Sequence, residues 1–313
     1  MSTSDKHLHN PTFEWRFLHP RFWGVWCIVF LSFLLAFVPF RIRDKFACKL
    51  AKQVIKRKAS SLKRARLNLA QCFSEKTPEE REAILLSSIE VGLQFCLAYG
   101  ELLVRSEKYK KSRDAVFGGE HLFPLIEKGE NIISLTPHCW SIDYTGSMLA
   151  SRGVTITTIM RPQRNPVFDW LMHKQRTQYG RGMVYPRDAS IKPFLKSVKE
   201  GCLGYYLPDE DHGAQQSVFV PFFDAEKATL KGLGKLTKLT NAKVVPMFQA
   251  YNAQSGKYEL HIFPALENFP TGDETQDAIV MNKALEDMIG SCPEQYMWIL
   301  NILRTRPDGS RLY

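Results

Sequence analysis

His138 and Asp143 are the residues whose types and spacing most suggest catalysis. They frame the sequence His-Cys-Trp-Ser-Ile-Asp, which follows an apolar, strand-like run at 131–136 and precedes an expected helix. On one regular helix, positions five apart point roughly 140° away from each other. If His138 ends the strand and Asp143 lies in the first helical turn, however, the carboxylate can hold the imidazole and leave its other nitrogen free. This arrangement predicts a general base that deprotonates a substrate hydroxyl.

The spacing has two competing interpretations. With eight histidines and about one acidic residue in ten positions, a chain of this composition contains about one such pair by chance. His138 would then be a loop residue with an ordinary hydrogen-bond partner. Cys139 is a second candidate nucleophile, but adjacent residues rarely face each other, which disfavours covalent catalysis by this thiol.

The positive charge is concentrated in one segment. Eleven basic residues and one acidic residue, Asp44, lie between 41 and 66, so this segment carries the whole formal net charge of +10. A basic segment beside an apolar run is typical of a helix attracted to anionic lipid. Nucleic-acid binding is the alternative, but the segment lacks interleaved aromatic residues and a recognisable module. The seven cysteines contain no C-x-x-C pair, which argues against a disulfide framework or a zinc site.

The apolar run is residues 22–38, which are 17 residues without a charge and with Trp23 and Trp26 near one end. This length is at the lower limit for crossing a bilayer. A buried core helix and a signal peptide are the alternatives, although no small-x-small cleavage site follows the run. We expect a membrane anchor that either spans the bilayer once or lies in its interface. The basic residues that follow predict a catalytic domain on the cytoplasmic side.

The rest of the chain alternates strand and helix signals. A helix is expected over 77–106, which opens with Thr-Pro-Glu-Glu, and another over 166–179, which Asn165 caps and Gly180 follows. Such alternation predicts an α/β fold with a central mixed, mainly parallel sheet flanked by helices. The expected organisation is a polar segment at 1–21, an anchor helix at 22–40, and one catalytic domain at 41–313 with a basic, membrane-facing helix at 41–70. The expected strands are 131–136, 154–160, 183–185, 203–207, 243–248 and 258–263.

Nine stretches resemble, in order, the lipid A secondary acyltransferase family, which shares its H-x4-[DE] core with glycerolipid acyltransferases. They cover nearly the whole chain. The PHCWSID and YLPDEDHG stretches resemble the late-acting, myristate-adding members more closely, whereas VFVPFF and PEQYMW resemble the early-acting members equally well. The stretches are KRARLNLAQCF (63–73), PHCWSID (137–143), NPVFDW (165–170), PRD (186–188), GYYLPDEDHG (204–213), VFVPFF (218–223), KATL (227–230), VVPMF (244–248) and PEQYMWIL (293–300), followed by the tail RTRP (304–307).

This resemblance implies a glycerolipid acyltransferase-like fold and an enzyme of the inner membrane of a Gram-negative bacterium. Its reaction would move an acyl chain, expected to be myristoyl, from acyl carrier protein to the 3-hydroxyl of a hydroxyacyl chain on the Kdo-lipid A precursor. That step would complete hexa-acylated lipid A in lipopolysaccharide biosynthesis, without a cofactor or a metal. The implied partners are acyl carrier protein, the lipid A precursor and membrane phospholipid, with no nucleic acid.

The resemblance also implies roles for single residues. His138 would be the base and Asp143 its partner, and backbone N–H groups after His138 would support the oxyanion. Arg187 is expected to contact a phosphate or the oxyanion, because its planar fork binds two oxygens at once. The alternative for Arg187 is a surface ion pair with Asp188.

Further substrate contacts are expected from Asp209, Asp211 and His212 in the GYYLPDEDHG stretch, and from Arg161 and Arg164. That stretch has two other interpretations, an ordinary turn after a strand and a metal site that lacks a fourth ligand nearby.

Three other functions remain open. An early-acting lauroyltransferase of the same family and a glycerolipid acyltransferase would both use the same His-Asp base. In the third, the chain is a basic lipid-binding membrane protein without enzymatic activity.

Overall fold

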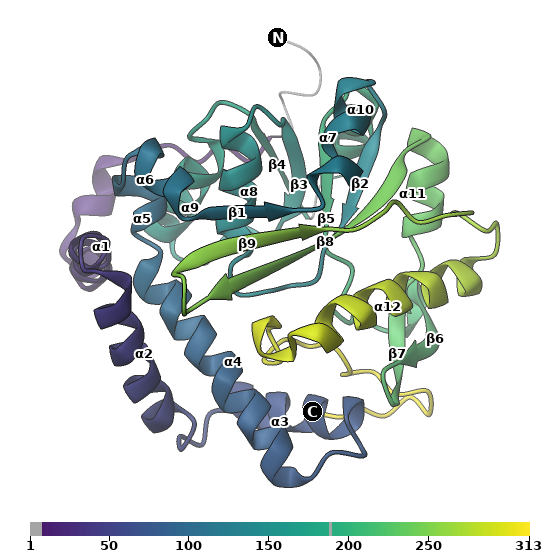
Figure 1. Cartoon of the computed structure of the whole chain (residues 1–313), viewed down its shortest axis with the longest axis horizontal. Coiled ribbons are helices and arrows are strands. Elements are labelled where there is room, and N and C mark those ends of the chain that lie inside the picture. Colours follow the sequence, from purple (N-terminus) through teal and green to yellow (C-terminus); the bar gives the residue numbers. More distant parts are fainter. Residues whose placement is uncertain (1–7, 188–189) are drawn as a thin grey trace.

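The protein was analysed as a computed structural model that describes residues 8–187 and 190–313. Its centre is a seven-stranded sheet in the order β1-β9-β8-β2-β5-β3-β4 (Figure 1). Every neighbouring pair is parallel except β8 and β9, so the expected mixed, mainly parallel α/β sheet is confirmed. The strands of this sheet are β1 (Asp114–Phe117), β2 (Ile132–Leu135), β3 (Ile156–Met160), β4 (Gly182–Pro186), β5 (Leu203–Tyr206), β8 (Lys243–Asn252) and β9 (Lys257–Ile262).

Helices cover both faces of the sheet, as the apolar strands require. The β2 strand reads Ile-Ile-Ser-Leu and is buried at all four positions. Six of the sheet strands were expected from such runs. The short β1 was missed, as was the antiparallel hairpin of β6 (Ser217–Phe222) and β7 (Ala225–Leu230). The helices of this part are α6 (Glu107–Ser112), α7 (Phe123–Glu127), α8 (Ile142–Ser151), α9 (Pro166–Thr177), α10 (Lys192–Lys199), α11 (Leu233–Thr240) and α12 (Glu274–Ser291).

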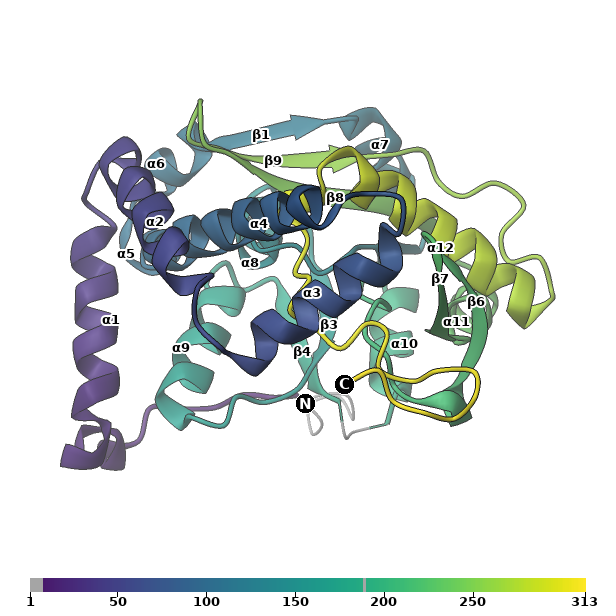
Figure 2. The same cartoon turned by 90° about the horizontal axis from the view of Figure 1, so that it is seen from below.

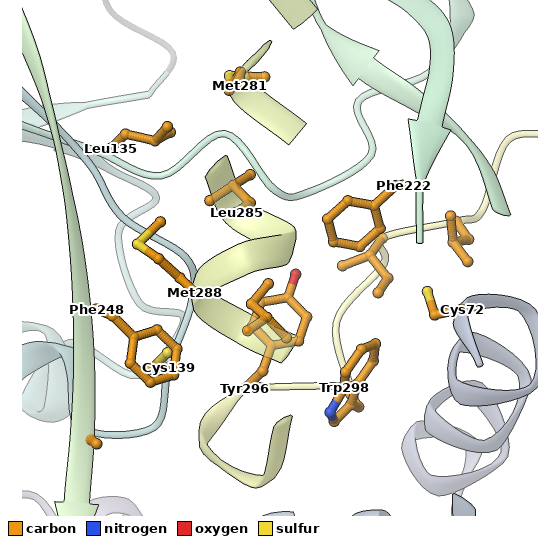
Figure 3. Close-up of a cluster of buried hydrophobic side chains, with 14 of the residues drawn as sticks. Cys72, Leu135, Cys139, Phe222, Phe248, Met281, Leu285, Met288, Tyr296 and Trp298 are labelled. Atoms are coloured by element: carbon orange, nitrogen blue, oxygen red, sulfur yellow. The ribbon is translucent and has the colours of Figure 1, made fainter. Parts of the chain in front are cut away.

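Two apolar clusters lie on the two faces of the sheet. On one face, α8 and part of α4 pack over strand residues such as Ile132, Val245 and Met247. On the other face, α10 and α12 pack over Ile133 and Leu135. Figure 3 shows this second cluster, in which Met281, Leu285 and Met288 come from α12 and Tyr296 and Trp298 from the C-terminal segment.

The N-terminal third forms a helical layer against the sheet. It contains α1 (Trp23–Leu35), α2 (Phe40–Val54), α3 (Ser60–Cys72), α4 (Pro78–Ala98) and α5 (Glu101–Val104). The α4 helix begins with a capping box in which Thr77 and Glu80 each accept a backbone N–H from the other. The basic segment forms two helices, α2 and α3, where one helix over 41–70 was expected.

The chain end crosses back to the loop that follows β2. The Met297 N–H donates to the carbonyl of His138 at 2.9 Å, and the Trp140 N–H donates to the carbonyl of Gln295 at 3.1 Å. The Asn68 amide in α3 donates to the carbonyls of Trp298 and Leu300. Trp298 is fully buried. Residues 295–297 therefore fix the loop after β2, and α3 in turn fixes the C-terminal segment that contains them.

Candidate active site

Four neighbouring strands end at the same edge of the sheet and carry the expected site residues there. His138 is the third residue after β2, and Asp209 is the third residue after β5. Arg161 and Arg187 directly follow β3 and β4. Because β2, β5, β3 and β4 are consecutive and parallel, their carboxyl ends lie side by side. The carboxyl ends of parallel strands are where α/β sheets bind their ligands.

His138 is held by Asp209. The imidazole Nδ1 lies 2.5 Å from Asp209 Oδ1, and the backbone N–H of His138 donates to Asp209 Oδ2 at 2.8 Å. The Asp209 side chain is fully buried, whereas the His138 side chain is 26% exposed. Both oxygens of one carboxylate thus bind one residue, which fixes the ring and leaves Nε2 as the nitrogen available to a substrate.

The electrostatics of this pair favour an ionised carboxylate beside a basic imidazole. Burial alone would raise the pKa of Asp209, but the charge of His138, its two hydrogen bonds and the ammonium of Lys227 lower that pKa to about 2. Burial alone would lower the pKa of His138, but the charge of Asp209 and its hydrogen bond raise it above the ordinary value of 6.5. Asp209 therefore stabilises the imidazolium that forms when His138 accepts a proton.

Asp143 has a different partner from the expected one. Its Oδ1 accepts from Arg176 Nε at 2.8 Å and lies 2.7 Å from Arg176 Nη2, while the Tyr99 hydroxyl donates to Oδ2 at 3.4 Å. The expectation that Asp143 orients the imidazole is therefore wrong in its geometry, because Asp209 occupies Nδ1. Asp143 lies in the first turn of α8, as expected, and from there it reaches across to α9.

A cavity of about 680 Å³ adjoins both the His138–Asp209 pair and the Asp143–Arg176 pair. His138, Asp143, Arg161, Arg176, Arg187 and His212 all contribute to its wall. Much of the remaining wall is apolar and comes from both faces of the sheet. The apolar residues include Ile142, Ala150, Ile156, Ile159, Met183, Phe194, Leu207 and Leu236. The cavity thus combines a base, several cations and a hydrocarbon-like surface.

Arg187 and His212 lie together in the cavity wall. The guanidinium of Arg187 donates to His212 Nδ1 at 2.5 Å and is 3.7 Å from the carboxylate of Glu210. Burial and the charge of Arg187 lower the pKa of His212, so its ring is neutral and accepts this hydrogen bond. Asp188, the alternative partner of Arg187, lies outside the described residues.

Two other expected substrate contacts are placed differently. Asp211 accepts hydrogen bonds from the hydroxyl of Thr305, from the backbone N–H of Thr305 and from the N–H of Gly213. Its carboxylate therefore fastens the C-terminal segment and is not part of the cavity wall. Arg164 is exposed in the loop before α9 and is also absent from the cavity wall.

The surroundings of His138 argue against Cys139 as a nucleophile and occupy three of the backbone N–H groups that follow His138. Cys139 is fully buried, and burial raises the pKa of its thiol well above the ordinary value, so this sulfur is not a thiolate. The N–H groups of Cys139, Trp140 and Ile142 already donate to carbonyls of Pro137, Gln295 and Cys139. These three N–H groups are not available to an oxyanion.

Arg176 was not expected from the sequence. It is a basic residue in the last turn of α9, a position where cations are common because they complement the helix dipole. Because its position has this local explanation, the sequence does not indicate that Arg176 is the counterion of Asp143. The pairing of His138 with Asp209 was also missed, because 71 residues separate them.

Comparison with known proteins identifies relatives along nearly the whole chain. The family model of bacterial lipid A biosynthesis acyltransferases matches residues 10–305. A lipid A biosynthesis acyltransferase of Haemophilus influenzae is 44% identical over 96% of this chain and 94% of its own length. The lipid A biosynthesis myristoyltransferase of Escherichia coli K12 is 36% identical over 96% and 92%, and the lauroyltransferase of the same organism is 29% identical over 96% and 97%.

Proposed function

The chain belongs to the bacterial lipid A biosynthesis acyltransferases, and from this membership we propose a specific reaction. The protein transfers a fatty acyl chain from acyl carrier protein to the 3-hydroxyl of a hydroxyacyl chain on the Kdo-lipid A precursor. His138, with Asp209 on its far nitrogen, is the general base.

The observation that carries this proposal is the His138–Asp209 pair at the wall of a large, partly apolar cavity. A pair of this kind, whose neighbour Cys139 is fully buried, suits activation of an external hydroxyl. An apolar wall suits a fatty chain, which a soluble polar substrate would not require. The arginines at the same cavity suit an acceptor that carries phosphates.

The reaction balances with these groups alone. His138 Nε2 takes the proton of the acceptor hydroxyl as its oxygen attacks the thioester carbonyl, and a tetrahedral oxyanion forms. The oxyanion collapses, the carbon–sulfur bond breaks, and the imidazolium returns the proton to the departing thiolate of the carrier. The products are the ester and the free thiol. Asp209 stays ionised throughout, as its pKa of about 2 requires.

Arg176 is the group that supports negative charge in this proposal. Its guanidinium lines the cavity, and two of its nitrogens, Nε and Nη2, bind the same carboxylate oxygen of Asp143. Asp143 is then a positioning residue for a cation, and the two residues of the H-x4-D motif act through different partners. Arg187, Arg161 and His212 complete the polar wall and contact the acceptor.

We assign the late-acting, myristoyl-transferring type within the family. Supporting this, the chain is more similar to the myristoyltransferase of E. coli than to its lauroyltransferase. Acyl carrier protein as the donor is supported by the net charge of +10, since a basic enzyme attracts an acidic carrier.

The test is an acyl transfer assay with the purified full-length chain. Acyl carrier protein loaded with laurate, myristate or palmitate is incubated with the protein and with penta-acyl or tetra-acyl Kdo-lipid A. The masses of the products are measured by mass spectrometry. We expect one myristoyl chain on the penta-acyl acceptor. Transfer only to the tetra-acyl acceptor would assign the early-acting type. Transfer to glycerol phosphate instead, or no transfer at all, would reject the proposed reaction.

A further inference from the structure

The residues before α1 are attached to the catalytic domain. The His9 N–H donates to the carbonyl of Val184 in β4 at 2.8 Å, and the His9 ring lies 2.8 Å from the carboxylate of Asp169 in α9. Phe17 is only 2% exposed and shares a buried cluster with Val167 and Leu171 of α9. The chain therefore enters α1 from the surface of the sheet domain.

The residues after α1 are attached to the same domain. Arg43 in α2 forms a fully buried ion pair with Glu101 at 2.7 Å and donates to the carbonyl of Leu35, the last residue of α1, at 3.0 Å. Gly100 approaches α1 so closely that a β-carbon there would collide with the backbone carbonyl of Ser32. Both ends of α1 are thus fixed to one folded unit.

The helix is also short for a bilayer. Its 13 residues are about 20 Å long, whereas the hydrocarbon core is about 30 Å thick. Figures 1 and 2 show α1 lying along one flank of the molecule, and neither view shows it projecting away. Val29 packs inward, while the outward face carries large apolar side chains that are more than half exposed. These are Trp23, Ile28, Phe30, Leu31 and Leu34, with Phe37 just beyond the helix.

The neighbouring α2 continues this outward surface. Ile42 is 61% and Phe46 55% exposed, and they lie one turn apart on the helix. Exposed basic residues accompany them at Arg41, Lys45 and Lys49. An apolar stripe bordered by cations is complementary to the surface of an anionic bilayer.

A different helical segment, and not α1, is long and apolar enough to cross a membrane, but it is internal. The segment from Pro78 to Val104 meets that criterion by length and composition, yet half of its apolar window is buried inside the protein. Its α4 part packs against α2, α3 and the sheet domain. It is therefore a core element.

We propose that the protein is monotopic: α1 lies in the plane of one leaflet, and α1 and α2 together form the surface that binds an anionic phospholipid bilayer. A helix whose two flanking segments bind the same folded domain cannot place them on opposite sides of a membrane. Of the two alternatives left open by the sequence, a single pass and insertion in the interface, this proposal selects the second. It depends on the fold alone and stands apart from the reaction proposed above.

The first experiment compares the two ends of the full-length chain in bacteria. Different epitope tags are fused to the N-terminus and the C-terminus, and protease is added to intact spheroplasts and to inverted membrane vesicles. We expect both tags to behave alike, protected in spheroplasts and cleaved in inverted vesicles. Cleavage of only one of the two tags in either preparation would show a crossing and overturn the proposal.

The second experiment measures flotation of purified protein with vesicles. Phe30→Glu combined with Leu34→Glu is expected to lower binding to phosphatidylethanolamine–phosphatidylglycerol vesicles at least about tenfold. Leu239→Glu is the matched control, because Leu239 is 47% exposed on α11, at the opposite side of the molecule (Figure 1). Its binding should equal that of the wild type. Circular dichroism and the melting temperature verify that each variant is folded.

The vesicle experiment also distinguishes binding through this surface from nonspecific hydrophobic adsorption. Replacing phosphatidylglycerol with phosphatidylcholine, or raising the salt concentration, is expected to weaken wild-type binding, since the basic residues act through anionic lipid. Equal binding of the α1 double variant and the wild type would overturn the proposal. An equal loss with Leu239→Glu would also overturn it.

Discussion

Two carboxylates serve the same cavity in different ways. Asp209 is fully buried, binds the ring and the backbone of His138, and has its pKa lowered to about 2. Asp143 is partly exposed, holds the guanidinium of Arg176, and accepts a weaker hydrogen bond from Tyr99. One carboxylate prepares a base and the other prepares a cation.

The difference shows that His138 and Asp143, the two ends of the H-x4-D motif, do not bind each other. Each of its residues finds a partner far along the chain, Asp209 for His138 and Arg176 for Asp143. The motif marks where a strand meets a helix, and this junction directs two side chains toward neighbouring strands and helices. The following predictions test whether the two systems are separate, from the largest effect to the smallest.

Removing the base should have the largest effect. His138→Ala is expected to lower kcat by about 10³-fold or more, because general base catalysis commonly contributes about 10²–10⁴. Acyl transfer assays would measure this, and vesicle flotation should be unchanged. His121→Ala, a histidine outside the cavity wall, is the matched control and should retain activity. Full activity of His138→Ala would exclude the proposed base.

Replacing the partner of the base should cost less and should also move the pH dependence. Asp209→Asn is expected to lower kcat/KM by about 10²-fold. The base works only when His138 is unprotonated, so activity falls as the pH drops through its raised pKa. Loss of the Asp209 charge removes the main cause that raises this pKa, so the acid limb should move to lower pH. An acid limb that stays in place would contradict the pairing.

Replacing the other carboxylate should have a moderate effect that depends on Arg176. Asp143→Asn and Arg176→Gln are each expected to lower kcat/KM by about tenfold. A double-mutant cycle measures their coupling, and the combined variant should lose little more than either single one. Asp143→Asn combined with Asp209→Asn should instead multiply the two losses. Strong coupling between the two carboxylates would restore the direct His138–Asp143 interpretation.

The smallest effect on catalysis is expected at Asp211, two residues from Asp209. Asp211→Asn should lower the free energy of unfolding by about 1–3 kcal/mol, because the hydrogen bonds to Thr305 are weakened. Thermal unfolding measures this loss. The acid limb of the pH profile should stay where it is in the wild type, in contrast to Asp209→Asn. A moved limb would mean that Asp211 also influences His138.

Much of the fold follows from local sequence patterns. Buried parallel strands such as β2 are apolar at nearly every position, and α4 and α9 carry the capping residues Thr77 and Asn165 that define their starts. The β1 strand was missed because it begins with Asp114 and has no fully buried position, unlike the equally short β2, which is buried throughout. The segment at 1–21 was predicted only as polar, and its packing on the catalytic domain through His9 and Phe17 is a contact that no local pattern encodes.

The site could be predicted only where chemistry and local structure coincide. His138 was expected at the end of a strand and lies there, whereas Arg187 was expected from the resemblance alone, and the structure places it after another strand at the same edge. The choice between Asp143 and Asp209 as the partner of His138 depends on strand order. Because β5 lies next to β2, Asp209 comes to the ring. Sequence patterns predict strands far better than they predict which strands are neighbours.

The contact between the chain end and the loop after β2 has a consequence for synthesis. The carbonyl of His138 and the N–H of Trp140 are both bound by residues 295–297, which are synthesised after every strand of the sheet. During synthesis, the growing chain therefore contains His138 and Asp209 before it contains the residues that hold the loop of His138. A chain cut before residue 293 leaves this loop without those hydrogen bonds, so we expect it to fold poorly as well as to be inactive.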